Sequence, residues 1–372
     1  MRLYETRQRA VVPLDASPAS TVRMYVCGIT PYDATHVGHA ATFLAYDVLQ
    51  RRLRDLGCRT RCVRNITDVD DDLLARARAM GVHYLDLAAG SLAAFDADMA
   101  ALGLLPADAE PRATSAISDI RRLIGRVLDS GHAYRSGDDV FFDISTAPSF
   151  GELCGLDAAE MVVLARSHGG RPDDPNKRNP LDFVLWQRSA PGEPEWSSAW
   201  GLGRPGWHVE CSALALAHLG ETIDVHGGGS DLVFPHHECS QAQSQAVTRR
   251  PFVRHWMHTS MVCLGGAKMS KSAGNLAFVA DLRERWDPMA VRLALLGAHY
   301  RTDWEWSEGR VADAARRLER WRSAGRGDGA LAHVRERIDD DLDTPGALAA
   351  IDAAVAQGAP VSDAAALLGV VL

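Results

Sequence analysis

Short apolar runs and longer amphipathic stretches alternate along the first third of the chain. An apolar run at 24–26 leads into a glycine-bearing turn at 27–31. Apolar residues then recur at helical spacing over 39–56, with arginines between them, and the pattern ends at Gly57. Residues 61–67 alternate as a strand does. Strand, helix and strand form a βαβ unit, which predicts a parallel sheet and an α/β fold.

The middle of the chain changes in composition. Residues 73–135 are predicted to be mostly helical, whereas residues 136–200 are rich in Gly, Pro and Trp. We interpret 136–200 as an irregular insertion into the α/β domain. Apolar runs at 222–225 and 252–256 predict that the sheet resumes there.

The last part of the chain has a helical pattern from about Pro288. A linker is expected at 323–329, and the residues that follow are rich in Ala and Leu, which predicts two or three short helices over 331–372.

Composition narrows the class of protein. The 372 residues suffice for about two or three domains, and 47% hydrophobic with 24% charged residues is typical of a globular protein. Lys and Arg number 40 against 48 Asp and Glu, so the formal charge of -8 gives RNA binding no support. Neither a signal-type apolar run after Met1 nor a stretch of about 18 apolar residues occurs, so we expect a cytoplasmic protein without a membrane span.

Seven cysteines occur at wide spacing. An odd number in a chain of this size argues against a disulfide scaffold. We therefore expect reduced thiols, some of them metal ligands.

A possible phosphate site lies between the first strand and the first helix, in the sequence His36-Val37-Gly38-His39. A helix N-terminus attracts phosphate, and Gly38 lets a nucleotide approach the backbone. Imidazoles three residues apart can donate hydrogen bonds to phosphoryl oxygens. Taken alone, the pattern is equally that of a helix start with two incidental histidines.

A second basic sequence, Lys268-Met269-Ser270-Lys271-Ser272, suits a triphosphate whose charge must be neutralised during transfer. Alone it could be a solvated loop. Both sequences in this order, in a chain that starts with a βαβ unit, resemble the HIGH and KMSKS signatures of class I aminoacyl-tRNA synthetases. The resemblance implies that the first binds ATP and the second stabilises the transition state of adenylate formation.

Thiolate and imidazole are zinc ligands, and Cys27, Cys211 and His236 are such residues. Their spacing alone does not distinguish a metal site from buried cysteines and a polar loop histidine. From about residue 20 to residue 280, however, the chain resembles cysteinyl-tRNA synthetases in the blocks Cys27-Gly28-Ile29-Thr30, Asn65-Ile66-Thr67-Asp68-Val69-Asp70, Arg204-Pro205-Gly206-Trp207-His208 and Gly227-Gly228-Gly229-Ser230-Asp231.

This resemblance implies that Cys27, Cys211 and His236 bind one Zn²⁺. A protein-held zinc would distinguish the sulfur of cysteine from the hydroxyl of serine, which shape alone does poorly. Catalytic roles in forming cysteinyl-AMP from cysteine and ATP, with Mg²⁺, are implied for His36, His39, Lys268 and Lys271.

Substrate contacts are implied by the same resemblance. Trp207 closes the pocket over cysteine, whose ammonium group lies near Thr67 and Asp231. Further residues that contact the substrate or the adenylate are Cys27, Gly28, Ile29, Thr30, Gly38, Thr42, Asn65, Ile66, Gly229, Ser230 and Val262. Asp231 and His208 are two possible bases for a later proton transfer.

The family also implies a domain organisation. We expect a Rossmann-like parallel-sheet nucleotide-binding domain over residues 1–280, with a connective segment inserted at about 90–200. A stem-contact-like helical segment is expected at 281–322 and a C-terminal helical bundle at 323–372. The Ala-rich end leaves no room for an anticodon-binding domain.

Three features depart from the cysteinyl-tRNA synthetases. Ser240 stands where those enzymes have a fourth zinc ligand, Glu, and Asp72 stands where they have Lys. Cys239 precedes Ser240 and is either a further ligand or a packing residue. The first loop reads Cys-Gly-Ile-Thr-Pro-Tyr-Asp instead of Cys-Gly-Pro-Thr-Val-Tyr-Asp.

The loop at 27–36 and the C-terminal residues 365–372 resemble the mycothiol-pathway cysteine ligases of actinobacteria. That resemblance covers nearly the whole chain and implies transfer of cysteine to the amine of glucosaminyl-inositol. Within the segment 167–172 only the glycines and the proline agree with that family. The partners expected are cysteine, ATP and this sugar, without nucleic acid or membrane, in a monomer. The alternatives are a compact cysteinyl-tRNA synthetase and a non-catalytic cysteine-binding paralogue.

Overall fold

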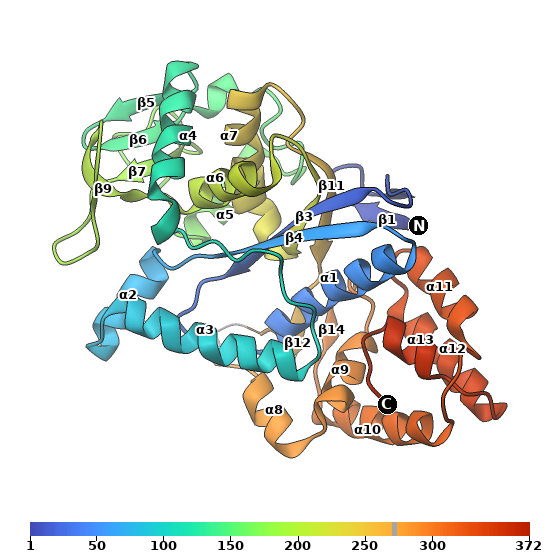
Figure 1. The fold of residues 1–372 in the computed structure, drawn as a ribbon. Coiled ribbons are helices and arrows are strands. Elements are labelled where there is room, and N and C mark those ends of the chain that lie inside the picture. The colour runs from blue at the N-terminus through green and yellow to red at the C-terminus, as the bar shows by residue number, and fades with distance from the viewer. Residues whose placement is uncertain (270–273) are drawn as a thin grey trace.

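The computed structural model describes residues 1–269 and 274–372. A four-stranded parallel sheet lies at its centre, in the spatial order β11-β10-β3-β4 (Figure 1). The strands span Val253–Thr259, Ile223–Gly229, Thr21–Ile29 and Arg59–Ile66, respectively. The predicted βαβ unit is confirmed, with α1 at Val37–Asp55 as its helix.

Alternate residues of β3 face opposite sides of the sheet. Met24 and Val26 belong to the core that contains α1, whereas Tyr25 and Cys27 belong to a second core. The second core contains α6 (Trp207–Leu219) and α7 (Glu238–Thr248). Strand alternation therefore directs the Cys27 side chain toward the helix that carries Cys211.

The insertion contains a second sheet of five strands in the order β5-β6-β7-β9-β8. The expectation of irregular structure over 136–200 was wrong, because these antiparallel strands are only three to five residues long and are separated by turns. They span Ala133–Ser136, Asp139–Phe142, Phe183–Gln187, Gly201–Pro205 and Trp196–Ser198. The helices α4 and α5 of this region span Ile117–Asp129 and Ala158–Ser167.

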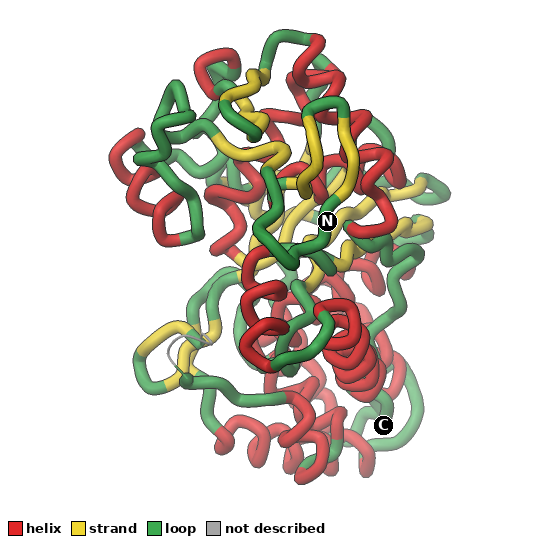
Figure 2. The backbone as a smooth tube through the Cα atoms, turned by 90° about the vertical axis from the view of Figure 1, so that its left-hand side faces the viewer, coloured by secondary structure: helices red, strands yellow, loops and turns green. Residues whose placement is uncertain are grey.

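Helices dominate the rest of the chain, and Figure 2 shows several helices gathered beside the C-terminus. In Figure 1 these C-terminal helices lie on the opposite side of the molecule from the insertion. The helices α2 and α3 span Asp71–Met80 and Tyr84–Ala101. From α8 to α13 the helices span Val279–Arg285, Pro288–Leu296, Glu308–Ser323, Leu331–Asp339, Thr344–Ala356 and Ser362–Leu367. Two or three short helices were predicted over 331–372, and three are present there, α11 to α13.

Smaller elements complete the structure. The N-terminal strands β1 and β2 pair antiparallel over Arg2–Glu5 and Ala10–Pro13. A small sheet contains β12, β13 and β14 at Val262–Leu264, Ala267–Lys268 and Trp304–Glu305. Short helical turns span Thr114–Ala116, Ile144–Thr146, Ser230–Leu232 and Val233–His237. None of the helices in the described ranges is sufficiently long and apolar to cross a bilayer.

A fully buried arginine joins the C-terminal residues to the catalytic sheet. The Arg292 guanidinium forms an ion pair with Asp47 of α1. It also donates hydrogen bonds to the carbonyl oxygens of Leu368 (2.8 Å) and Leu102 (2.9 Å). Three segments distant in sequence therefore meet at one buried charge.

Candidate active site

A cavity of about 920 Å³ opens at the carboxyl ends of β3, β4 and β10. In parallel α/β sheets, ligands bind in the crevice at this edge. The predicted site residues that line the cavity are Cys27, Gly28, Ile29, Thr30, His36, Gly38, His39, Thr42, Asn65, Thr67, Trp207, Cys211, Gly229, Asp231, His236, Val262 and Lys268. The fold therefore brings most of the predicted set into one chamber.

Among the predicted residues that the structure describes, two do not line the cavity. The Ile66 side chain is buried in the core beside α1. Ser230 is exposed at the start of a short helical turn. Lys271 lies outside the described residues.

The predicted zinc ligands meet at one wall of the cavity. Cys27 lies near the end of β3, Cys211 lies in the first turns of α6, and His236 precedes α7. Their ligand atoms all lie within 4.8 Å of one another, and the two Sγ atoms are 3.9 Å apart. Two sulfurs on a tetrahedral zinc with bonds of about 2.3 Å would be about 3.8 Å apart. The donor set and its spacing therefore fit zinc.

The thiols of Cys27 and Cys211 affect each other's pKa in opposite directions. A hydrogen bond from Cys27 lowers the pKa of Cys211 well below its usual value, whereas burial raises the pKa of Cys27. A buried thiolate is a strong ligand for a soft or borderline cation.

A second group of possible metal ligands shares Cys27 and adds His226 and His237. Neither of these histidines lines the cavity. Burial lowers the pKa of both imidazoles, so they are neutral. His237 places Nε2 3.1 Å from Cys27 Sγ and Nδ1 2.7 Å from Nε2 of His258. Since all three residues of the first group line the cavity and only Cys27 of the second does, the first group is the better site for binding a substrate sulfur.

Aromatic and polar residues surround His236. The Trp207 ring centroid lies 4.4 Å from that of His236, and Nδ1 of His208 lies 3.1 Å from Nδ1 of His236. Cys239 is buried and belongs to neither group of ligands found among the described residues. It packs in the second core and also lines the cavity.

The first helix presents its N-terminus to the cavity. His36 is the N-cap, and its Nδ1 accepts a hydrogen bond from the backbone N–H of Gly38 (3.1 Å). A neutral ring that accepts at Nδ1 carries its proton on Nε2. The His36 and His39 rings stack with centroids 3.8 Å apart. The helix end and both imidazoles thus form one surface suited to an anion.

The floor of the cavity depends on one glycine. A Cβ at position 28 would lie 1.6 Å from the carbonyl oxygen of Asn65, so only glycine allows β3 and β4 to approach there. The Asn65 side chain accepts from the backbone N–H of Gly28 (2.9 Å) and donates to Thr67 Oγ1 (3.0 Å).

On the β10 side of the cavity, Nζ of Lys268 lies 2.9 Å from Oδ2 of Asp231. This ion pair connects Asp231, which was predicted to lie near the substrate ammonium group, with the first lysine of the predicted basic sequence. Both side chains are partly exposed, as expected at the opening of a cavity.

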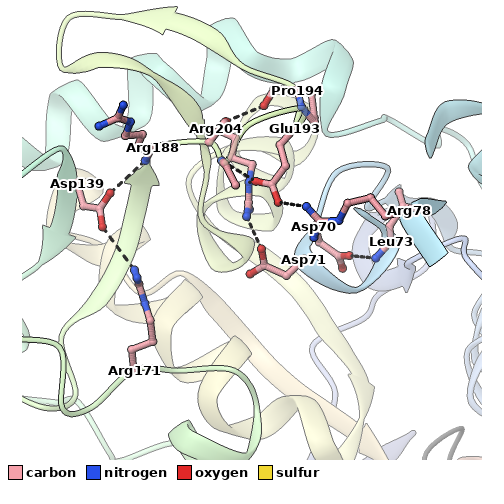
Figure 3. A network of polar contacts seen from close by, with 12 residues as sticks. Asp70, Asp71, Leu73, Arg78, Asp139, Arg171, Arg188, Glu193, Pro194 and Arg204 are labelled. Atoms are coloured by element: carbon pink, nitrogen blue, oxygen red, sulfur yellow. Dashed lines mark hydrogen bonds and ion pairs between the residues drawn. The ribbon is translucent and has the colours of Figure 1, made fainter. Parts of the chain in front are cut away.

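An acidic region on the β4 side was not predicted. Asp70, Asp71 and Asp72 line the cavity at the start of α2. In Figure 3, Arg204 contacts both Asp71 and Glu193, and Glu193 also contacts Arg78. The segment 167–171, for which the sequence suggested no role, also lines the cavity. The acidic residues and the 167–171 segment reach the cavity through the tertiary fold. A sequence pattern does not reveal such placement.

The fold and the cavity define the class of the protein. Residues 13–316 match the family model described as tRNA synthetases class I (C) catalytic domain. The structure is similar to Mycobacterium tuberculosis methionyl-tRNA synthetase in complex with methionyl-adenylate, with a TM-score of 0.67 and 16% sequence identity over 95% of this chain and 88% of that chain. This second likeness shows the fold alone.

Proteins similar in sequence show which family within this class the chain belongs to. The chain is 52% identical to the L-cysteine:1D-myo-inositol 2-amino-2-deoxy-alpha-D-glucopyranoside ligase of Thermobispora bispora, over 95% of this chain and 89% of the relative. It is 50% identical to the ligase of the same name from Streptomyces griseus, over 95% and 88% of the two chains. The chain belongs to this ligase family, which shares the class I synthetase catalytic domain.

Proposed function

We propose that this chain activates L-cysteine with ATP as cysteinyl-AMP and transfers the cysteinyl group to the amine of glucosaminyl-inositol. The products would be an amide, AMP and pyrophosphate. The observation that carries the proposal is the Cys27–Cys211–His236 group, which opens into the same cavity as His36, His39 and Lys268. The relatives' shared name supplies the acceptor.

The first step is adenylate formation. The cysteine carboxylate attacks the α-phosphate of ATP, the bond to the leaving pyrophosphate breaks, and negative charge develops on the phosphoryl oxygens. His36 and His39 at the N-terminus of α1, together with Lys268, donate hydrogen bonds to these oxygens. Lys271 is proposed to act with them.

Cysteine recognition requires a group that prefers sulfur to oxygen. Cys27, Cys211 and His236 would hold Zn²⁺, which supplies Lewis acidity toward a substrate sulfur and thereby selectivity against serine. Thr67 and Asp231 bind the ammonium group, and Trp207 covers the pocket. ATP is the co-substrate, with Mg²⁺ on its phosphates.

We also propose the remaining assignments made from the sequence. The residues predicted to contact the substrate or the adenylate are proposed to do so, with Ile66 and Ser230 contributing through their backbone atoms. The catalytic domain spans 1–280 with its insertion, followed by a helical segment at 281–322 and a bundle at 323–372. The protein is proposed to work as a cytoplasmic monomer without nucleic acid.

The molecule that accepts the cysteinyl group can be identified by experiment. Purified protein is incubated with cysteine, ATP and either glucosaminyl-inositol or tRNA, and AMP release is measured. We expect release that depends on glucosaminyl-inositol. Release that depends on tRNA alone would indicate a synthetase, and the absence of cysteine-dependent ATP–pyrophosphate exchange would indicate a non-catalytic protein.

A further inference from the structure

A single carboxylate on the β4 side of the cavity is held in a fixed orientation by neutral donors. Asp70 is the N-cap of α2, and its Oδ1 accepts from the backbone N–H of Leu73 (2.8 Å), as Figure 3 shows. Its Oδ2 accepts from Oγ1 of Thr30 (3.0 Å). A carboxylate offers about four acceptor positions, so capacity remains on the face that lines the cavity.

Other basic groups near the substrate site already have strong partners. Asp231 forms an ion pair with Lys268. His208 places Nδ1 3.1 Å from Nδ1 of His236, a predicted metal ligand. Asp70, in contrast, forms no ion pair with a lysine, arginine or histidine in the described part of the chain.

The charged groups around Asp70 are mostly acidic. Asp71 and Asp72 follow it on α2, and Tyr32 of the β3–α1 loop and Glu210 of α6 face it. The nearby guanidinium of Arg204 on β9 is paired with Asp71 and Glu193 instead.

The pKa of Asp70 is raised to about 6, mainly by burial, which together with the charges of Asp72 and Asp71 outweighs the hydrogen bonds from Leu73 and Thr30. A carboxyl group with a pKa near neutrality is a more effective proton acceptor than an ordinary one.

We propose that Asp70 is the general base of the transfer step, accepting the proton of the acceptor amine. This inference rests on the proposed function. The neutral amine nitrogen forms a bond to the carbonyl carbon of cysteinyl-AMP, and the bond between that carbon and the phosphate oxygen breaks. AMP leaves with the electron pair of that bond, and the nitrogen gives one proton to the Asp70 carboxylate. An acceptor that arrives as an ammonium ion loses its extra proton to solvent beforehand.

The test separates the two half-reactions in the full-length protein. Cysteine-dependent ATP–pyrophosphate exchange reports activation, and single-turnover transfer from preformed cysteinyl-AMP to glucosaminyl-inositol reports the second step, measured from pH 5 to pH 9. Asp70→Asn should leave exchange within about twofold and slow transfer about 100-fold or more. Protonation of the acceptor amine lowers the rate at low pH in both proteins, but the wild-type rate should fall more steeply below about pH 6, where Asp70 also becomes protonated, and the variant should lack this additional fall.

Matched variants exclude a purely structural effect. Asp86→Asn changes an exposed carboxylate in the first turn of α3, which does not line the cavity, and should leave both rates unchanged. Asp70→Glu should recover part of the transfer rate and the pH dependence. Transfer at the wild-type rate in Asp70→Asn, or exchange and transfer slowed equally, would overturn the assignment. If the Asp70→Asn protein is insoluble, the pH profile of the wild-type protein and the transfer rate of Asp70→Glu provide the test. No exchange in the wild-type protein would overturn the proposed function, and this inference with it.

Discussion

The Nε2 atom of His237 lies 3.1 Å from the Sγ atom of Cys27, and whereas Cys27 lines the cavity, His237 does not. Nδ1 of the same ring contacts His258, whose own Nδ1 lies 2.7 Å from Oγ1 of Thr6. Side chains that hold a metal ligand from behind orient it and tune its donor strength. His237 is therefore placed to support the proposed zinc site without being a ligand that the substrate can reach.

Replacing His237 should weaken metal binding. His237→Ala removes the contact to Cys27, and the loss of such a partner typically lowers metal affinity about 10- to 100-fold. The measurement is zinc retention during titration with a chelator. His132→Ala is the control, because His132 lies in the insertion and contacts Thr146 instead. Equal zinc retention in both variants would mean that His237 plays no part in the site.

Removing the buried arginine should destabilise the whole chain. Arg292→Met leaves Asp47 without its fully buried partner and leaves the Leu102 and Leu368 carbonyls without their donor. Breaking a buried ion pair in this way costs about 3–5 kcal/mol. Urea denaturation measures the loss in the free energy of unfolding. Arg316→Met removes an exposed pair with Asp313 and should have little effect, so equal losses would contradict the role assigned to Arg292.

Asp70 should lower stability at neutral pH. Its folded-state pKa of about 6 lies above the unfolded value of about 3.9, so the folded protein holds this proton more tightly. The ionised carboxylate therefore costs stability above pH 6, and the cost disappears below about pH 4. Asp70→Asn should raise the free energy of unfolding at pH 7.5 by about 1–2 kcal/mol and leave it unchanged at pH 4. A variant that is less stable at pH 7.5 would contradict the raised pKa.

Local patterns predicted the parts of the fold that depend on local sequence. The helix over 39–56 and the strands on either side have clear apolar periods, and they occur within a few residues of the predicted limits. The strands of the insertion were missed because three to five residues are too few to show a period of two. Tertiary pairing forms that sheet, and single-chain patterns do not report pairing.

In the active site, local residue pairs could be predicted from the sequence, whereas pairs distant in sequence could not be predicted from spacing. The His36 and His39 pair is local to one helical turn, so its geometry follows from the sequence. The Cys27 and Cys211 pair joins positions 184 residues apart and was expected only from the family resemblance. Asp70 belongs to a quoted sequence block, but its role depends on burial and on Thr30, 40 residues away. Neither feature can be inferred from spacing.

The central claim is that Cys27, Cys211 and His236 hold a zinc ion that selects cysteine by its sulfur. The most direct measurement is the zinc content of purified wild-type protein and Cys211→Ala, together with ATP–pyrophosphate exchange for cysteine and for serine. We predict one zinc per wild-type chain, exchange with cysteine far above exchange with serine, and loss of both zinc and exchange in the variant. A metal-free wild-type protein that is fully active, or one that activates serine as readily as cysteine, would contradict the account.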